Sequence, residues 1–342
     1  MNPGNTGTYL HTFTYPELYD LIKKEFVNKL ESLPIDASPL FIKRGIPMHS
    51  GNIRRFTEDD MSTYARLKPE GQDAKKGNYG IGYFKDMLQK RIALEMPLTY
   101  EARTMDQWSR VGEIISGLAE TPINRINLDM THRLTFCDVT SYVDMDGSLV
   151  DVTTGDGLSL VNTAHTLAFS ANTYSNRVPL DPQFSQTALE AAELLITTDI
   201  VDNYGVRKVM KFTHIITTDE PKTVNDVRTF LRSTSNVNQA NSAVINVYQT
   251  KYEHLVLHSI DTDANGNKDA SKSKWWFLAA LSGSDRLKAF YGEWEAPHMN
   301  DMPTSSNYGV DVHNDDFTYG VRAGYGLVIV SGRGIIGSLA VA

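Results

Sequence analysis

Cysteine is almost missing from this sequence, since Cys137 is the only one among 342 residues. One thiol cannot form an intrachain disulfide, which excludes a disulfide-stabilised scaffold and favours a reducing compartment. Long apolar runs are missing as well, because no stretch approaches the roughly 18 residues that would span a membrane. The first residues lack the basic region and apolar core of a signal peptide, so we expect the protein to stay in the cytosol where it is made.

An excess of positive charge is also missing. The chain has 33 Lys and Arg against 41 Asp and Glu, and its net charge is -8. An acidic protein cannot gain sequence-independent affinity for DNA from its overall field, which counts against a repressor or a DNA clamp. The hydrophobic content of 41% is ordinary for a folded protein, and the length predicts two subdomains or a core with long arms.

Catalytic motifs are the third absence, because the sequence has no G-x-S-x-G elbow, no P-loop and no activated-cysteine signature. Gly332, Gly334 and Gly337 have the spacing of a dinucleotide-binding fingerprint, but only residues 338–342 follow them. The fingerprint needs a helix N-terminus to bind a pyrophosphate, so we expect a turn between terminal strands instead. Cys137 follows an apolar residue at a helix end and is expected to be buried in packing.

A partial calcium-binding pattern occurs at Asp261, Asp263, Asn265 and Gly266. The twelfth position, which should be a bidentate glutamate, is Lys272. The pattern therefore indicates an exposed loop tip rather than a calcium site.

Two pairs of titratable residues remain as candidates. His254 and His258 have the spacing of a helical zinc pair, but their segment YEHLVLHS favours a strand and offers no third ligand nearby. Glu293 and Glu295 flank Trp294 and could form the acid/base pair of an enzyme. Surface carboxylates beside an aromatic ring are common, however, so this pattern alone does not indicate catalysis. We therefore expect no catalytic, cofactor-binding or metal-ligating residues and no cofactor.

The longest helical pattern covers residues 104–136. Its apolar positions recur every three or four residues, at Trp108, Val111, Ile115, Leu118, Pro122, Ile126, Met130 and Leu134. Pro122 interrupts the pattern, and Gly112 and Gly117 weaken the half before it. We expect one long helix that is kinked near Pro122, where one carbonyl is left unpaired and the helix can bend.

Before this helix, the sequence predicts an amphipathic helix over residues 13–33, whose apolar stripe has no neighbouring helix to cover it. We expect this stripe to pack on a distant part of the chain or on another copy. Residues 53–100 read as two extended arms around a tip rich in Gly and Lys, ending in the alternating segment Ile92 to Tyr100. Pro97 marks that segment as an edge strand. Because isolated two-stranded hairpins are marginally stable, we expect a neighbouring subunit to support these arms.

After the long helix, short β-like runs with Asp-Gly turns are expected, and then a mixed α/β subdomain. Helices are predicted over 184–200 and 220–231, and strands over 209–217, 242–250, 252–259 and 275–278. The alternation from Phe317 to Ile329 predicts a long strand, and residues 335–339 are expected to be extended.

The order of these parts resembles the major capsid protein of tailed bacteriophages, the HK97-like fold. The segments that carry the resemblance are TYEARTMDQWSRVGEIISGLAETPINRI, TGDGLSLVNTAH, HIITTDEPKTVNDVRTFL, KWWFLAAL, DRLKAFYGEWE and DFTYGVRAGYGLVIVSGRGIIGS. They sample nearly the whole chain, and none is a catalytic motif.

The resemblance implies an α+β fold with four parts. These are an N-terminal arm (1–52), an extended hairpin or E-loop (53–100), a peripheral domain with the long helix and an antiparallel sheet (101–180 and 291–342), and an α/β apical domain (181–290). Some members of the family crosslink neighbouring subunits through a hairpin lysine. The lysines of that region are Lys68, Lys75, Lys76 and Lys85, and no motif singles one out.

The resemblance also implies function. Such proteins form pentamers and hexamers in an icosahedral shell around double-stranded DNA, which is not bound sequence-specifically. Portal, scaffold and decoration proteins are then expected partners, no membrane is involved, and the location is the virion, after assembly in the host cytoplasm. The alternatives are an encapsulin-type compartment, which shares the fold, and a hydrolytic α/β enzyme built on Glu293, Glu295, His254 and His258.

Overall fold

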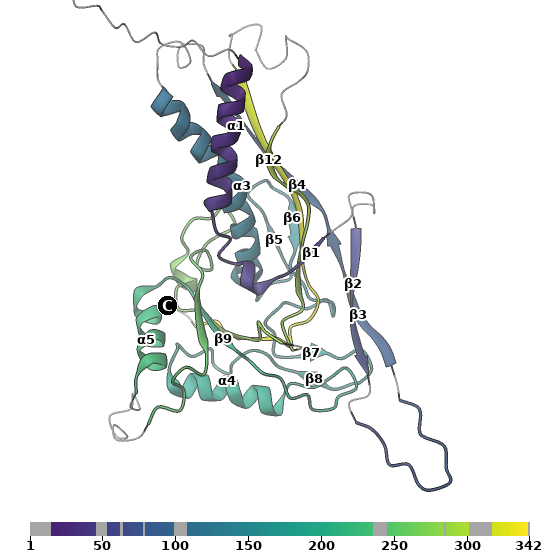
Figure 1. Ribbon diagram of the computed structural model, residues 1–342. Helices are drawn as coiled ribbons and strands as arrows, with labels where there is room; N and C mark the ends of the chain where they lie inside the picture. Colours follow the sequence, from purple (N-terminus) through teal and green to yellow (C-terminus); the bar gives the residue numbers. More distant parts are fainter. Residues whose placement is uncertain are drawn as a thin grey trace, which may run out of the picture. The chain divides into compact units, whose positions relative to one another are not determined.

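The chain has a mixed α+β architecture in the computed structural model (Figure 1). The structure describes residues 15–45, 53–61, 64–77, 79–98, 108–234, 245–283, 285–300 and 317–340, with the side chains of 15–22, 61, 98, 108–112 and 317 left outside that description. The helices are α1 (Tyr15–Ser32), α3 (Trp108–Thr135), α4 (Gln186–Thr198) and α5 (Pro221–Arg232), with short 3-10 turns η1 (Ser38–Leu40) and η3 (Ala270–Lys272).

The strands are short except for five long ones. In chain order the strands are β1 (Ile42–Gly45), β2 (Ile53–Met61), β3 (Tyr79–Leu88), β4 (Lys90–Leu98), β5 (Ser141–Val143), β6 (Leu149–Asp151), β7 (His165–Thr166), β8 (Thr173–Tyr174), β9 (His214–Thr217), β10 (Glu253–Val256), β11 (Trp276–Ala279), β12 (Ala289–Met299), β13 (Phe317–Ile329) and β14 (Ile335–Ser338). The five long ones are β2, β3, β4, β12 and β13. The α+β class expected from the sequence is confirmed.

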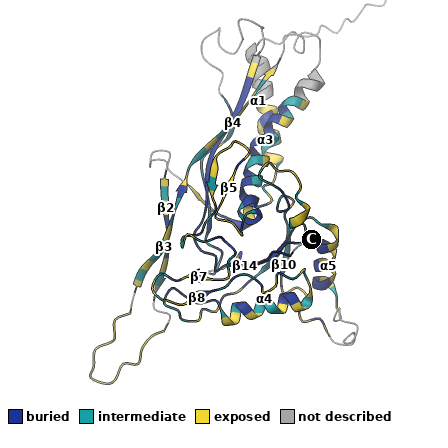
Figure 2. Cartoon of the chain, turned by 180° about the vertical axis from the view of Figure 1, so that it is seen from behind, coloured by how far each residue is buried: buried dark blue, intermediate teal, exposed yellow. Residues whose placement is uncertain are grey.

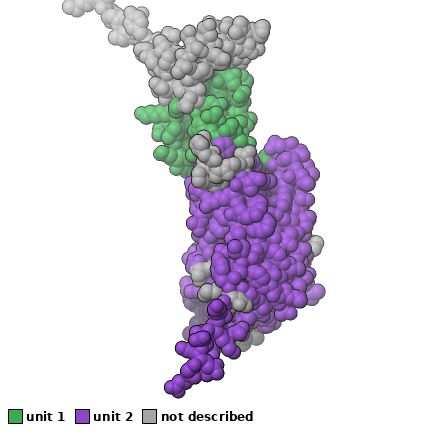
Figure 3. All heavy atoms as spheres, turned by 90° about the vertical axis from the view of Figure 1, so that its right-hand side faces the viewer, with its two compact units in different colours: residues 1–35, 91–125, 295–324 green, residues 36–90, 126–294, 325–342 purple. Residues whose placement is uncertain are grey.

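The chain divides into two compact units, which Figure 3 shows in different colours. Unit 1 contains residues 1–35, 91–125 and 295–324, and unit 2 contains residues 36–90, 126–294 and 325–342. The four-part division implied by the resemblance stays a prediction. No helix in the described part of the chain is long and apolar enough to cross a membrane.

In unit 1, α1 lies beside the first half of α3 (Figure 1). Phe26 of α1 is fully buried, and Lys29 forms an ion pair of 3.0 Å with Glu120 of α3. At Phe26 and Lys29, the N-terminal helix therefore packs within its own chain. The long helix is confirmed over Trp108–Thr135 with Pro122 inside it, while residues 104–107 lie outside the described range.

Eight of the strands form two four-stranded sheets. The first has the order β1-β12-β13-β4, so β4 is at its edge, as Pro97 predicts. The second, in unit 2, has the order β10-β9-β11-β14 and is mixed, because β9 pairs with β10 in parallel and with β11 antiparallel. The segment from Ile92 onward thus belongs to a four-stranded sheet, and the hairpin is made by β2 and β3 alone.

A core cluster packs α4 and α5 against the second sheet. Its members include Leu189 of α4, Val227 of α5, and Trp276 and Leu278 of β11. The alternating blue and yellow of α4 in Figure 2 shows one face of this helix buried and the other exposed, as its sequence predicts. Ser185 caps α4 by accepting a hydrogen bond from the Ala188 amide over 3.1 Å.

Three strand predictions are wrong or too long. Of residues 252–259, only Glu253–Val256 are a strand. Of residues 209–217, only His214–Thr217 are a strand, and Val209 is 82% exposed. Residues 247–250, expected in a strand, form a turn, and the Asn246 side chain before it accepts a hydrogen bond from the Tyr248 amide. Residues 242–244 lie outside the described range. A side chain that bonds its own backbone competes with strand pairing, which explains the turn at 247–250.

Candidate functional site

The β2–β3 hairpin is attached to its own subunit by a buried ionic cluster in unit 2. Strand alternation points Glu58 and Asp60 of β2 to the same face. Arg333 donates from Nη1 to Glu58 over 2.7 Å and to Asp60 over 3.3 Å, and from Nη2 to Asn203 over 2.6 Å. The side chains of Arg333 and Glu58 are each only 5% exposed. A buried guanidinium that bridges two carboxylates fixes the hairpin in one position.

Arg333 reaches the hairpin from the turn between β13 and β14, which contains Gly332 and Gly334. The backbone there has no room for side chains. A Cβ on Gly332 would lie 2.9 Å from the Asn176 amide nitrogen, and one on Gly334 would lie 2.6 Å from the backbone of Leu287. The turn predicted for this glycine pattern is confirmed, and its glycines allow close packing.

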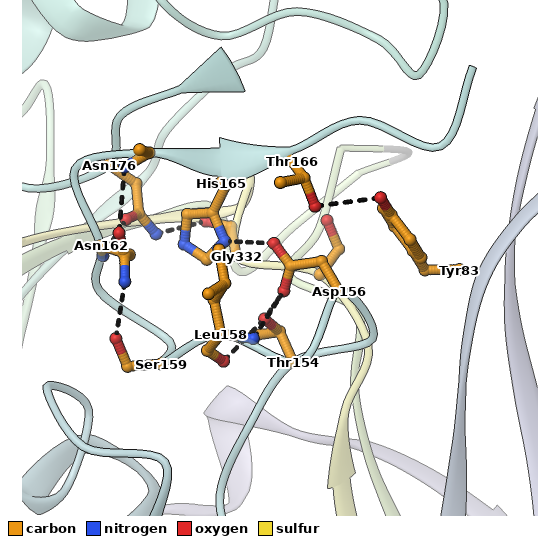
Figure 4. Close-up of polar contacts among 12 residues, drawn as sticks. Tyr83, Thr154, Asp156, Leu158, Ser159, Asn162, His165, Thr166, Asn176 and Gly332 are labelled. Atoms are coloured by element: carbon orange, nitrogen blue, oxygen red, sulfur yellow. Dashed lines mark hydrogen bonds and ion pairs between the residues drawn. The ribbon is translucent and has the colours of Figure 1, made fainter. Parts of the chain in front are cut away.

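A polar loop before α4 lies under this turn, and its contacts are drawn in Figure 4. His165 Nδ1 lies 2.8 Å from Asp156 Oδ2, and both side chains are buried. Asn176 donates to the carbonyls of Leu160, over 2.7 Å, and Gly332, over 3.0 Å. This loop, the TGDGLSLVNTAH segment of the sequence, is thereby tied to the β13–β14 turn.

The ring of Tyr174 connects the two clusters. It stacks on His165 with ring centroids 4.8 Å apart, and the Arg333 guanidinium lies 5.4 Å from its centroid. Burial raises the pKa of the Tyr174 hydroxyl. Burial also opposes ionisation of Asp156, but the hydrogen bond from His165 and its charge outweigh it, so the pKa of this carboxyl is lowered.

Close backbone contacts and polar bonds extend the attachment along β3. A Cβ on Gly80 would lie 2.5 Å from the Phe169 ring, and one on Gly82 would lie 2.8 Å from Asn203. Tyr83 and Thr166 hydroxyls are 2.9 Å apart, and Lys85 forms an ion pair with Asp151 over 2.5 Å. The hairpin strands are therefore supported by their own subunit, and additional support from a neighbouring subunit stays a prediction.

The opposite face of the hairpin carries exposed apolar side chains. They are Ile53 (54% exposed), Tyr79 (66%), Ile81 (61%), Phe84 (48%) and Leu88 (65%). We call these five residues the outer hairpin face. Arg55 lies over the Phe84 ring at 3.9 Å and pairs with Asp86. In Figure 2 the tip beyond the strands, residues 64–77, is exposed along its whole length. It includes Lys68, Lys75 and Lys76, whereas Lys85 is engaged at the base.

The glutamates suggested as an acid/base pair each have basic partners. Glu293 forms an ion pair with Lys43 in unit 2. Glu295 pairs with Arg91 over 3.2 Å and with Arg322 over 2.8 Å in unit 1, and its side chain is 7% exposed. Their contacts are those of structural ion pairs.

His254 lies on β10, in a strand as the sequence predicts, whereas His258 lies in the turn just after β10, where a strand was expected. His254 Nε2 is 2.8 Å from the Thr217 hydroxyl, and His258 lies 3.5 Å from Asp219. Burial, and then the charge of Arg228, lowers the pKa of His254 to about 4. Since β10 and β12 belong to different sheets, these histidines and the two glutamates do not form one site.

The calcium-like segment forms a closed turn. Asp263 accepts hydrogen bonds from the Asn265 and Asn267 amides, both over 2.8 Å, and Asp261 lies 3.4 Å from Lys268. These carboxylates thus bind their own loop. Cys137 is buried, and burial raises the pKa of its thiol, as expected for a packing residue.

The ionic cluster at Arg333 was not found from the sequence. Glu58 and Asp60 alternate with Phe56, which is a signal that they share its buried face, but their partner is more than 270 residues away in the chain. A single sequence contains no information that pairs such distant residues.

Comparisons with known proteins give structural matches only. No family model and no curated protein sequence match this chain. Similar solved structures include a procapsid of bacteriophage JBD30, with 11% identity over 95% of this chain and 76% of that chain and a TM-score of 0.48. The capsid of Ralstonia phage GP4 matches with 11% identity over 88% of this chain and 87% of that chain, with a TM-score of 0.47.

A virus-like particle from Pyrococcus furiosus is a further match, with 8% identity over 93% of this chain and 97% of that chain and a TM-score of 0.43. The titles of these three structures name a procapsid, a capsid and a virus-like particle. Because the identities and TM-scores are low, what this chain does has to be argued from its own residues.

Proposed function

We propose that this protein is the major capsid protein of a tailed double-stranded DNA bacteriophage. Its copies would assemble as pentamers and hexamers into an icosahedral shell that encloses the genome. The described elements follow one another in the order that the resemblance implies, from an N-terminal helix and a hairpin through a long helix to an α/β unit and closing strands.

The observation that carries this proposal is the two-sided hairpin. Its inner face is fixed to unit 2 through Arg333, and its outer face presents Ile53, Ile81 and Leu88 to solvent. A rigid strand pair with a contiguous apolar face is suited to burial against another protein. In a self-assembling shell, that other protein is a second copy of the chain.

The remaining partners follow from the same proposal. Portal, scaffold and decoration proteins would meet the shell, and DNA would be enclosed without sequence-specific contacts, in keeping with the net charge of -8. The protein would be located in the virion after assembly in the host cytoplasm.

An encapsulin-type compartment is the alternative with the same assembly, and the contents of particles separate the two, since a phage shell holds DNA and a compartment holds protein. The hydrolytic enzyme has less support. Glu293 and Glu295 each have a cationic partner, and His254 lies in a different sheet.

The test is the assembly state of the purified chain, measured by size-exclusion chromatography with light scattering and by negative-stain electron microscopy. We expect capsomers or closed particles. Ile81→Asp places a charge on the outer hairpin face and should leave free subunits, whereas Ile81→Val keeps the face apolar and should assemble as the parent does. A parent chain that stays monomeric at micromolar concentrations would contradict the proposal.

A further inference from the structure

Three metal-ligand side chains meet in the interior of unit 2, although no metal site is expected from the sequence. Asp129 and His132 are on α3, and Asp144 directly follows β5. One ligand atom from each of the three lies within 4.8 Å of the others. The residues are 3%, 0% and 5% exposed, respectively. Buried carboxylates and imidazoles in one place need compensating partners.

Local structure explains how the three side chains meet. Asp129 and His132 are three residues apart, so they share one face of α3. Asp144 is held by the β5–β6 turn, because its amide donates to Ser148 over 2.9 Å and its carbonyl accepts from Gly147 over 2.8 Å. Gly147 has a φ of +75°, which this turn requires.

The imidazole of His132 is oriented by a neighbouring hydroxyl, as is usual for metal-binding histidines. Thr262 Oγ1 donates its hydrogen to the Ser259 carbonyl over 2.7 Å, so it can only accept from His132 Nε2, which is 3.4 Å away. A neutral His132 then carries its proton on Nε2 and its lone pair on Nδ1. The rings of Phe136 and Tyr142 pack edge-on at 5.3 and 5.5 Å and hold this orientation.

Neighbouring groups orient the two carboxylates of the cluster. Tyr325 and the Lys90 ammonium both bind Oδ2 of Asp129, which makes Oδ1 the natural ligand atom of this carboxylate. Asp144 Oδ1 accepts a hydrogen bond from the Met145 amide over 2.9 Å.

We propose that Asp129, His132 and Asp144 form a structural site for a divalent transition-metal ion, for which Zn²⁺ is the probe. One imidazole and two carboxylates, with a water as fourth ligand, suit Zn²⁺. Ca²⁺ and Mg²⁺ prefer more oxygen ligands and no imidazole. The ion would join α3 to the β5–β6 hairpin, in addition to the packing of His132 against Tyr142 and the hydrogen bond from Arg133 of α3 to the Asp151 carbonyl of β6 over 2.7 Å.

The experiment uses the full-length chain, stripped with a chelator and then supplied with ZnCl₂ or MgCl₂. Bound metal is measured by mass spectrometry after gel filtration, and the unfolding temperature by circular dichroism. We expect about one zinc ion per chain, a rise of several degrees in the unfolding temperature with zinc, and no change with magnesium.

Variants separate this site from surface binding. Asp144→Asn is nearly isosteric and should lose both the zinc and the temperature rise, and His132→Gln should do the same. His258→Gln changes a histidine outside the cluster and should keep both. Circular dichroism without metal reports whether each variant is folded; if His132→Gln is not, Asp144→Asn decides. Zinc well below one ion per chain in the parent, or equal zinc in Asp144→Asn, would overturn the proposal.

Discussion

The hydroxyl of Thr121 donates a hydrogen bond to the backbone carbonyl of Leu118 over 2.9 Å. That carbonyl is four residues before Pro122, so it is the one that loses its helical donor because proline has no N–H. The side chain of Thr121 supplies the missing donor. The expectation of an unpaired carbonyl at this point is therefore wrong, and bending of α3 at Pro122 during changes of shell shape stays a prediction.

A double-mutant cycle tests this substitution of donors. Thr121→Val keeps the shape of the side chain and removes the hydroxyl, which should lower the free energy of unfolding by about 1–3 kcal/mol because a buried carbonyl loses its partner. In the Pro122→Ala background the backbone N–H returns, so the same change should cost about 0.5 kcal/mol or less. The free energies are measured by urea denaturation. If Thr121→Val lowers the free energy of unfolding equally in both backgrounds, the Thr121 hydroxyl does not replace the backbone donor that Pro122 lacks.

Arg333→Met should loosen the hairpin, because it leaves Glu58 and Asp60 without their buried cation. Breaking a buried ion pair by removing one partner costs about 3–5 kcal/mol. The free energy of unfolding should fall by this order, and amide hydrogen exchange in β2 and β3 should speed up. Arg55→Met is the matched control, since Arg55 pairs with Asp86 on the exposed face of the same hairpin and its loss should change little. If the two variants behave alike, the buried cluster is not what fixes the hairpin.

His254 should make the protein less stable as the pH falls from 6.5 to 4. Burial, then Arg228, lowers its pKa from 6.5 to about 4, so in this window the unfolded chain binds more protons than the folded one. His254→Gln removes this titrating group, so the free energy of unfolding should fall less between pH 6.5 and pH 4 than in the parent. The difference should be at most about 2 kcal/mol, because solvent screens a partly exposed group. Urea unfolding at several pH values measures it, and parallel profiles for parent and variant would speak against the assignment.

Leu180 is 101% exposed and has a φ of +66°, a conformation that favours glycine. Leu180→Gly removes no packing and relieves left-handed strain of about 1–2 kcal/mol, which outweighs the entropy of the unfolded glycine. We expect stability to stay the same or rise by about 1 kcal/mol. Leu194→Gly, at another exposed leucine but inside α4, should instead cost about 1 kcal/mol. Thermal unfolding of both variants provides the comparison, and a loss at Leu180 similar to that at Leu194 would refute it.

Local patterns in the sequence determined the helices and the long strands other than β12 (Ala289–Met299), which was not predicted. The proline at the start of α5, the serine before α4 and the alternation from Phe317 to Ile329 each act within a few residues, so each can be read without knowing the rest of the fold. The edge position of β4 followed from Pro97 in the same way, and the buried Cys137 from its apolar surroundings.

The tertiary structure alone decided which segments meet. Val209 has strand-like neighbours but no partner, and β9 is consequently only four residues long. The pairing of Arg333 with Glu58, and the meeting of Asp129 and His132 with Asp144, depend on contacts between segments that the chain keeps apart. A buried charged group is stable only when folding brings a partner next to it, and a single sequence does not show which distant residue that partner is.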